Sequence, residues 1–219
     1  MSIKIYIDQG HNPREFNTGA EGNGFYEQDI TYDIGVRLYN LLQRNPNFTV
    51  RLSRPTTETI LGFSNSSSLT SRVREANAWG ADVFLSLHTN ASVNPAATGS
   101  EALIYSTSSS VAYGLATDIL EEMTRYTGLR NRGIVERPGL YVLRRTNMPA
   151  VLVEMGFITN PEDANLMVYS PDLFAEGIYR GILKYYNHQL LDGRRRAVFS
   201  FHSYQTFRSL HILIKKEAK

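Results

Sequence analysis

Residues 81–88 read Ala-Asp-Val-Phe-Leu-Ser-Leu-His, a nearly continuous apolar run that ends in a histidine. A run of this length and character is typical of a strand that is buried on both faces within a parallel sheet. Similar runs at 3–8 and 150–153 lead into His11 and Glu154. Amphipathic helical patterns separate these runs, and strands that alternate with helices predict an α/β fold whose sheet is covered by helices.

The other expected elements follow from the hydrophobic periodicity and from the Gly, Pro and Asn residues that interrupt it. Helices are expected at 27–43, 69–79, 110–126, 161–168 and 172–187, and further strands at 48–52, 100–105 and 140–143. Segments 9–25 and 129–138 are expected to be loops.

The size and composition of the chain indicate one well-buried domain. The chain has 219 residues, of which 42% are hydrophobic and 20% charged, as is ordinary for a globular protein. We assign 1–191 to this domain and 192–219 to a basic C-terminal tail of unassigned structure. Within the tail, 194–219 contain seven Arg and Lys residues and one Glu, a net charge of +6. A basic tail is usually solvated and sometimes binds an anionic polymer.

Several classes of protein are disfavoured by the same inventory. The chain has no cysteine, which excludes disulfides and thiolate metal ligands. No apolar run approaches the ~20 residues of a transmembrane helix, so we expect no membrane span. The N-terminus leads directly into the first strand, so we expect no signal peptide either. A nucleic-acid partner is not expected.

Four polar residues stand at or beside the ends of these elements, where an open α/β sheet binds its ligands. His11 and His88 follow two apolar strands, Glu154 closes a third, and Glu27 opens the first helix. Two histidines and a glutamate can hold zinc with one position left open. Taken one at a time, each histidine could equally be a hydrogen-bonded structural residue.

Glu154 differs from the others because its surroundings, Val-Leu-Val before it and Met-Gly-Phe after it, are apolar. A carboxylate in such a place usually needs a partner. It can act as a general base and acid beside a metal ion. The alternative is a structural ion pair with Arg72 or Arg144.

Three motifs carry a resemblance to a known family. They are 7–11 (Ile-Asp-Gln-Gly-His), 86–91 (Ser-Leu-His-Thr-Asn-Ala) and 154–160 (Glu-Met-Gly-Phe-Ile-Thr-Asn). Together they resemble the zinc-dependent N-acetylmuramoyl-L-alanine amidases of the type-3 family, over about 3–187. Gln9 stands where that family has Pro, and Asn12-Pro13 replaces a Gly, so the loop beside His11 departs from the pattern.

The resemblance implies a single α/β domain with a mixed, mostly parallel six-stranded sheet flanked by helices on both faces. It implies one catalytic zinc ion on His11, Glu27 and His88, with Glu154 as general base and then general acid. Asn90 and Arg72 match recurring family positions and are expected to support the site.

The substrate that the resemblance implies is peptidoglycan, cleaved at the amide between the lactyl group of N-acetylmuramic acid and L-alanine. The enzyme would then act on the cell wall, outside the cytoplasm. Some members of the family depend on an accessory protein, so an activating partner is a further expectation.

Two rival functions stay open at this point. One is a zinc peptidase that acts on the stem peptide, since zinc exopeptidases also place ligands at strand ends. The other is a wall-binding or partner-activated member without catalysis of its own.

Overall fold

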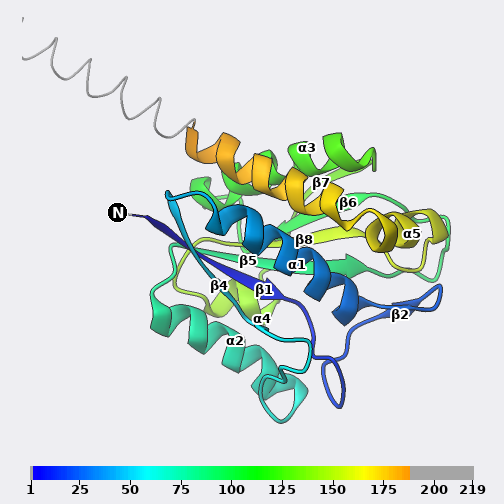
Figure 1. Ribbon diagram of the computed structural model, residues 1–219, viewed down its shortest axis with the longest axis horizontal. Coiled ribbons are helices and arrows are strands. Elements are labelled where there is room, and N and C mark those ends of the chain that lie inside the picture. The colour runs from blue at the N-terminus through cyan, green and yellow to red at the C-terminus, as the bar shows by residue number, and fades with distance from the viewer. Residues whose placement is uncertain (1, 188–219) are drawn as a thin grey trace, which may run out of the picture. The chain divides into compact units, whose positions relative to one another are not determined.

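The computed structural model describes residues 2–187, which form a six-stranded sheet covered by helices (Figure 1). Across the sheet the order is β4 (Phe48–Leu52), β1 (Ile3–Gln9), β5 (Val83–Asn90), β8 (Ala150–Phe157), β6 (Ser100–Ile104) and β7 (Asn131–Glu136). Neighbouring strands are parallel except β6 and β8, which are antiparallel. The predicted mixed, mostly parallel six-stranded sheet is therefore confirmed.

Helices lie on both faces of the sheet (Figure 1). The helices are α1 (Glu27–Gln43), α2 (Asn65–Trp79), α3 (Ser110–Thr127), α4 (Tyr141–Arg145), α5 (Pro161–Tyr169) and a helix that begins at residue 171. One face carries α1, α3 and the helix that begins at 171, and the opposite face carries α2 and α4. Among the described residues, none of these helices combines the length and apolar character needed to span a membrane.

Alternation along β1 explains why this strand has a helix layer on each side. Tyr6 is fully buried on the α2 face, where its ring stacks on Phe84 at 5.7 Å between centroids. Ile5 and Ile7 alternate with it and are also buried. Because successive side chains of a strand point to opposite faces, an apolar run of this kind is stable only between two layers.

The prediction for 140–143 is wrong, because this segment forms helix α4 and not a strand. The Arg144 amide donates to the Leu140 carbonyl, which is a helical bond, and Val142 and Leu143 are buried against the α2 face of the sheet. A short apolar run satisfies a helix or a strand equally well, so its neighbours in space decide.

Strands were missed in the two segments expected to be loops. The polar segment 129–138 contains β7, which lies at the edge of the described sheet and, within residues 2–187, pairs only with β6. An edge strand that is half exposed needs no apolar run. Segment 9–25 contains the short antiparallel strands β2 (Glu21–Gly22) and β3 (Phe25–Tyr26). The basic tail assigned to 192–219 lies outside the described residues.

The helix of residues 171–182 approaches α3 closely enough to require glycine. A Cβ on Gly177 would lie 2.6 Å from the Met123 Cα, and a Cβ on Gly181 would overlap the Cα of Ile119. These two glycines, one helical turn apart, form the contact surface between the helices.

We therefore expect Gly181→Ala to destabilise the protein. Overpacking of this kind typically costs about 1–3 kcal/mol. Gly139→Ala is the matched control, because a Cβ there would meet no atom within 4 Å. Urea unfolding of the full chain measures both free energies, and equal stabilities for the two variants would contradict the close packing.

Candidate metal centre

His11, Glu27 and His88 converge at the carboxyl edge of the sheet. His88 lies in β5, His11 follows β1, and these two strands are parallel neighbours. Glu27, the first residue of α1, lies between the imidazoles, with one oxygen 3.1 Å from His11 Nε2 and the other 3.1 Å from His88 Nδ1. One ligand atom from each residue lies within 4.8 Å of the others, so the expected cluster is assembled.

The hydrogen bonds around this cluster leave a gap that a cation would fill. His11 Nδ1 lies 3.2 Å from the Asn17 amide oxygen, an acceptor, so Nδ1 carries the proton and Nε2 presents a lone pair to Glu27. The Glu27 carboxylate already accepts the Ala20 and Thr89 amides at 2.8 and 2.9 Å. A lone pair that faces a carboxylate is repulsive unless a positive charge lies between them.

The donor set suits a zinc ion in particular. Two imidazole nitrogens and one carboxylate are the ligands of several catalytic zinc sites, in which the fourth position is left for water or substrate. Burial opposes ionisation of Glu27, but its interactions with the neighbouring His11 and His88 outweigh burial and hold its pKa well below the usual range. Glu27 is therefore a carboxylate, the form that binds metal.

Glu154 lies beside this cluster without a partner of its own. In the sheet it pairs in register with His88 on β5 and with Glu101 on β6. Its Oε2 atom is buried and makes no hydrogen bond within the described part of the chain. Burial, reinforced by the negative charges of Glu27 and Glu101, raises the pKa of Glu154 to about 8. This group has high proton affinity and is free to exchange a proton.

The structural alternative for Glu154 fails because the two candidate arginines lie elsewhere. Arg72 pairs with Asp8 at 2.6 Å, and both side chains are 1% exposed. Arg144 is exposed on α4 and lines a pocket with Tyr105 and Pro149. Within residues 2–187, neither forms an ion pair with Glu154.

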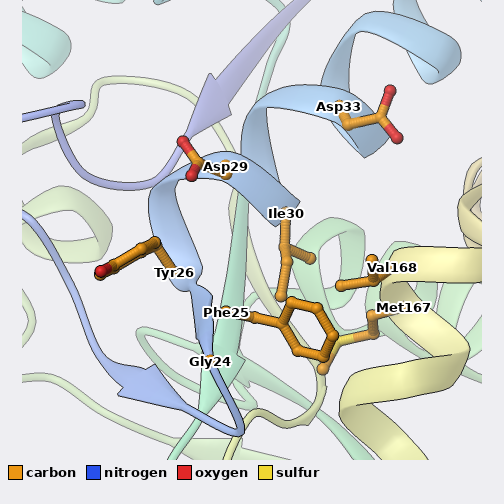
Figure 2. Close-up of a pocket in the computed structure, with 8 residues that line it drawn as sticks. All are labelled: Gly24, Phe25, Tyr26, Asp29, Ile30, Asp33, Met167 and Val168. Carbon is orange, nitrogen blue, oxygen red and sulfur yellow. The ribbon is translucent and has the colours of Figure 1, made fainter.

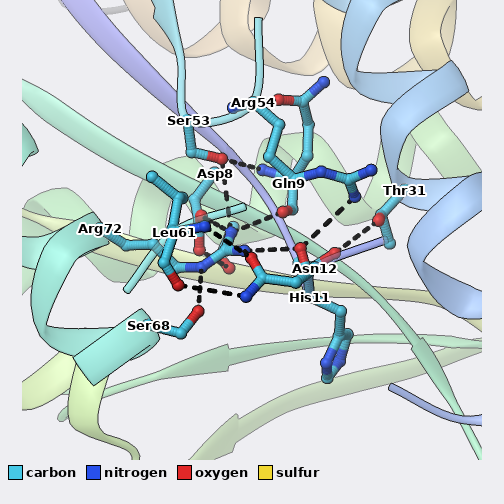
Figure 3. Close-up of polar contacts among 12 residues, drawn as sticks. Asp8, Gln9, His11, Asn12, Thr31, Ser53, Arg54, Leu61, Ser68 and Arg72 are labelled. Carbon is cyan, nitrogen blue, oxygen red and sulfur yellow. Dashed lines mark hydrogen bonds and ion pairs between the residues drawn. The ribbon is translucent and has the colours of Figure 1, made fainter. Parts of the chain in front are cut away.

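Arg72 shapes the backbone on which the first histidine stands (Figure 3). Its guanidinium donates to the carbonyls of Gln9 and His11 at 2.6 and 2.5 Å, and to Asp8. His11 itself has φ = +72°, a left-handed conformation that is costly for a residue with a Cβ. Arg72 therefore touches no ligand atom, but it holds the strained turn from which the imidazole projects.

Two other residues of the sequence motifs, one in 86–91 and one in 154–160, make hydrogen bonds that hold their segments in place. Ser86 donates to the second oxygen of Asp8 at 2.8 Å, so the serine two residues before His88 fixes the partner of Arg72. After Glu154, Asn160 caps the N-terminus of α5 by accepting the amides of Glu162 and Asp163. Both motifs thus combine a site residue with the bonds that hold its segment.

The two departures from the family pattern add contacts. Gln9 accepts the Arg54 amide at 2.9 Å and donates to the Tyr32 carbonyl at 3.3 Å, which ties the end of β1 to α1. The Asn12 side chain exchanges two hydrogen bonds with the backbone of Leu61, both at 3.1 Å. Neither departure removes a ligand.

Asn90 lies two residues after His88 and contacts Glu101, not the cluster itself. Its side-chain amide donates to Glu101 at 3.0 Å, and Arg132 donates to the other Glu101 oxygen at 3.3 Å. Sequence reasoning did not single out Glu101, Arg132 or Asn17. The sequence has no spacing pattern that points to these three residues. Each contacts residues that are distant in the chain, or lies in a loop.

Comparison with known families identifies the family to which this chain belongs. A family model described as N-acetylmuramoyl-L-alanine amidase matches residues 5–184, most of the chain. The chain belongs to this amidase family. The matched region contains the three residues of the cluster and Glu154.

Individual members of the amidase family are similar over the same region. The N-acetylmuramoyl-L-alanine amidase CwlM of Bacillus licheniformis is 38% identical over 180 residues, which are 82% of this chain. The chain spans only 65% of the length of that curated relative.

Solved structures of amidases share the fold. An N-acetylmuramoyl-L-alanine amidase from Clostridium difficile 630 has a TM-score of 0.76 and 34% identity, over 85% of this chain and 97% of that one. The CwlD amidase from Clostridioides difficile, solved in complex with the GerS lipoprotein, has a TM-score of 0.77 and 25% identity, over 85% of this chain and 99% of that one.

Loss of the Arg72 guanidinium should be costly for stability. Arg72→Met leaves the Asp8 charge buried without its partner, a change that typically costs about 3–5 kcal/mol. Arg37→Met is the matched control, since it breaks the more exposed Arg37–Asp172 pair and should cost under about 1 kcal/mol. Urea unfolding measures the free energy of unfolding of both variants. Similar losses would show that the Arg72–Asp8 pair contributes no more to stability than the Arg37–Asp172 pair.

Proposed function

We propose that the chain hydrolyses the amide between the lactyl group of N-acetylmuramic acid and L-alanine in peptidoglycan, with one zinc ion on His11, Glu27 and His88. The observation that carries this proposal is the Glu154 carboxylate beside the His–Glu–His cluster, whose Oε2 atom is buried and has no hydrogen-bond partner among the described residues. Family membership and the similarity to CwlM support the substrate class.

Each residue has a part in the proposed reaction. A zinc ion bound at the cluster would act as a Lewis acid toward the amide carbonyl and lower the pKa of water. Glu154 in its carboxylate form accepts the proton of the attacking water and then delivers it to the leaving amine nitrogen. Burial raises its pKa, and the positive charge of a bound metal ion would oppose that effect and favour the carboxylate. Asn17 keeps the His11 ring in the tautomer that presents Nε2 to the cluster.

The two supporting residues act at a distance from the substrate. Arg72 fixes the backbone of His11, and Asn90 orients Glu101, whose charge raises the proton affinity of Glu154. We assign both as supports of the site and not as groups that touch the scissile amide.

The proposed substrate gives the site of action, and a similar solved structure supports a protein partner. Peptidoglycan places the reaction at the cell wall, outside the cytoplasm. An activating accessory protein also belongs to the proposal, because the similar CwlD amidase was solved in complex with a lipoprotein.

Glu154→Gln should abolish turnover and leave zinc in place. The amide keeps the shape of the side chain but cannot accept the proton, and loss of a general base typically costs about 10²–10⁴-fold in rate. Elemental analysis should find one zinc per chain in this variant and in the wild type, whereas His88→Ala should lose it. Activity of Glu154→Gln within a few-fold of wild type would remove Glu154 from the mechanism.

The products of digestion separate the proposed amidase from a stem-peptide peptidase. Purified peptidoglycan treated with the full chain should release stem peptides that are intact and begin with a new L-alanine amino terminus. Mass spectrometry with amino-terminal labelling detects them. Release of single amino acids with the muramoyl–alanine bond intact would support the peptidase.

A further inference from the structure

The hairpin of β2 and β3 separates the two ligands His11 and Glu27 along the chain. Its turn residues, Asn23 and Gly24, have φ values of +54° and +79°. Two left-handed residues in a two-residue loop are the signature of a type I′ turn, for which Asn-Gly is the preferred sequence. Each strand of the hairpin has only two residues, so strand pairing alone gives it little stability.

The base of this hairpin holds Glu27 from two sides. The Glu27 amide donates to the Ala20 carbonyl at 3.0 Å, which fixes the start of α1. The Ala20 amide in turn donates to the Glu27 carboxylate at 2.8 Å, on the oxygen that faces His11. The position of this carboxylate therefore follows the position of the hairpin.

The tip of the hairpin is anchored to the segment that follows Glu154. The Asn23 side-chain amide donates to the Ile158 carbonyl at 2.8 Å. Gly22 lies against the same carbonyl, since a Cβ there would be 2.5 Å from the oxygen. The Ile158 amide donates to the Asn90 carbonyl at 2.8 Å, two residues beyond His88. The residue Ile158, which is fully buried, thus joins the segments that carry Glu27, His88 and Glu154.

A second, apolar anchor lies on the other side of the turn. Phe25 lines a pocket with Ile30, Met167 and Val168, and its ring points toward Met167 in Figure 2, away from Tyr26. Its edge-to-face contact with Tyr169 spans 6.1 Å between centroids. Apolar contact resists separation but is not directional, so the hydrogen bond of Asn23 is the contact that fixes the register of the hairpin on Ile158.

We propose that Asn23 is a positioning residue for the metal ligand Glu27. Its side chain fastens the hairpin to Ile158, and the hairpin, through Ala20, places the Glu27 carboxylate between the two imidazoles. This inference rests on the proposed metal site and adds to it a contact outside the ligands. Asn23 acts through Glu27 and touches neither metal nor substrate.

Two substitutions separate this role from the conformational demand of the turn. Asn23→Gly retains the left-handed backbone and loses the side-chain bond. Asn23→Asp tolerates the same conformation, keeps the size of the side chain and has no N–H to donate. Asn77→Asp is the matched control, because Asn77 also donates to a backbone carbonyl, that of Arg145, on α2 and α4.

The test measures the zinc dissociation constant of the full chain by competition with a chelator. Loss of a contact that orients a ligand typically weakens metal affinity by about 10–100-fold, and we expect this for both Asn23 variants. The Asn77→Asp variant should bind zinc as the wild type does. The visible spectrum of the Co²⁺-loaded protein should change in the Asn23 variants, and the Tm of the metal-free protein should stay close to that of wild type.

Three results would overturn the proposal. Zinc affinity within twofold of wild type in both Asn23 variants would show that the hairpin needs no such anchor. A fall in the metal-free Tm that matches the fall in affinity would make the role one of stability only. A wild-type chain that binds no zinc would overturn the metal site itself, which separates that failure from a failure of the Asn23 contact.

Discussion

The ion pair between Arg72 and Asp8 is the contact on which the rest of the site depends. Both groups are almost completely buried, and the guanidinium also donates to the carbonyls of Gln9 and His11, which fixes the end of β1 and the turn at His11. Burial opposes ionisation of Asp8, but the charge and hydrogen bonds of Arg72 outweigh it and hold the pKa of Asp8 below its usual value. A buried ion pair contributes little net stability, yet this one fixes a geometry that apolar side chains could not specify.

The three proposed ligands stand on elements that are fixed in different ways. His88 lies within a central strand, and His11 stands on a turn fixed by Arg72. Glu27 begins a helix, but the chain reaches it through a hairpin whose own pairing is minimal. The carboxylate is also the ligand whose oxygens receive amides from two different segments, Ala20 and Thr89. Glu27, which follows the hairpin with the fewest strand pairs, is therefore held by hydrogen bonds from segments on both sides.

Elements with a clear hydrophobic period could be predicted from the sequence, and elements without one could not. The buried strands and the first helix follow from periodicity, and helix 27–43 and strand 48–52 have the predicted bounds. The segment 140–143 was mistaken because four apolar residues do not distinguish a helix turn from a strand. The strand at 131–136 was missed because an exposed edge has no apolar pattern. In the site, strand ends and motifs pointed to the ligands and to Glu154, whereas Asn17 and Glu101 depend on contacts that no local pattern encodes.

The reversed direction of β6 determines how the chain passes from β5 to β6. Since β6 lies beyond β8 and runs against it, the connection at 91–99 joins β5 to β6 without a helix and passes across the end of β8. The Ser92 amide donates there to the Thr159 hydroxyl, and the Gly99 amide donates to the Asp163 carboxylate. Both ends of this connection are thus held on the segment that follows Glu154. Residues 93–96 of this connection are exposed, so changes of composition there leave its anchored ends in place.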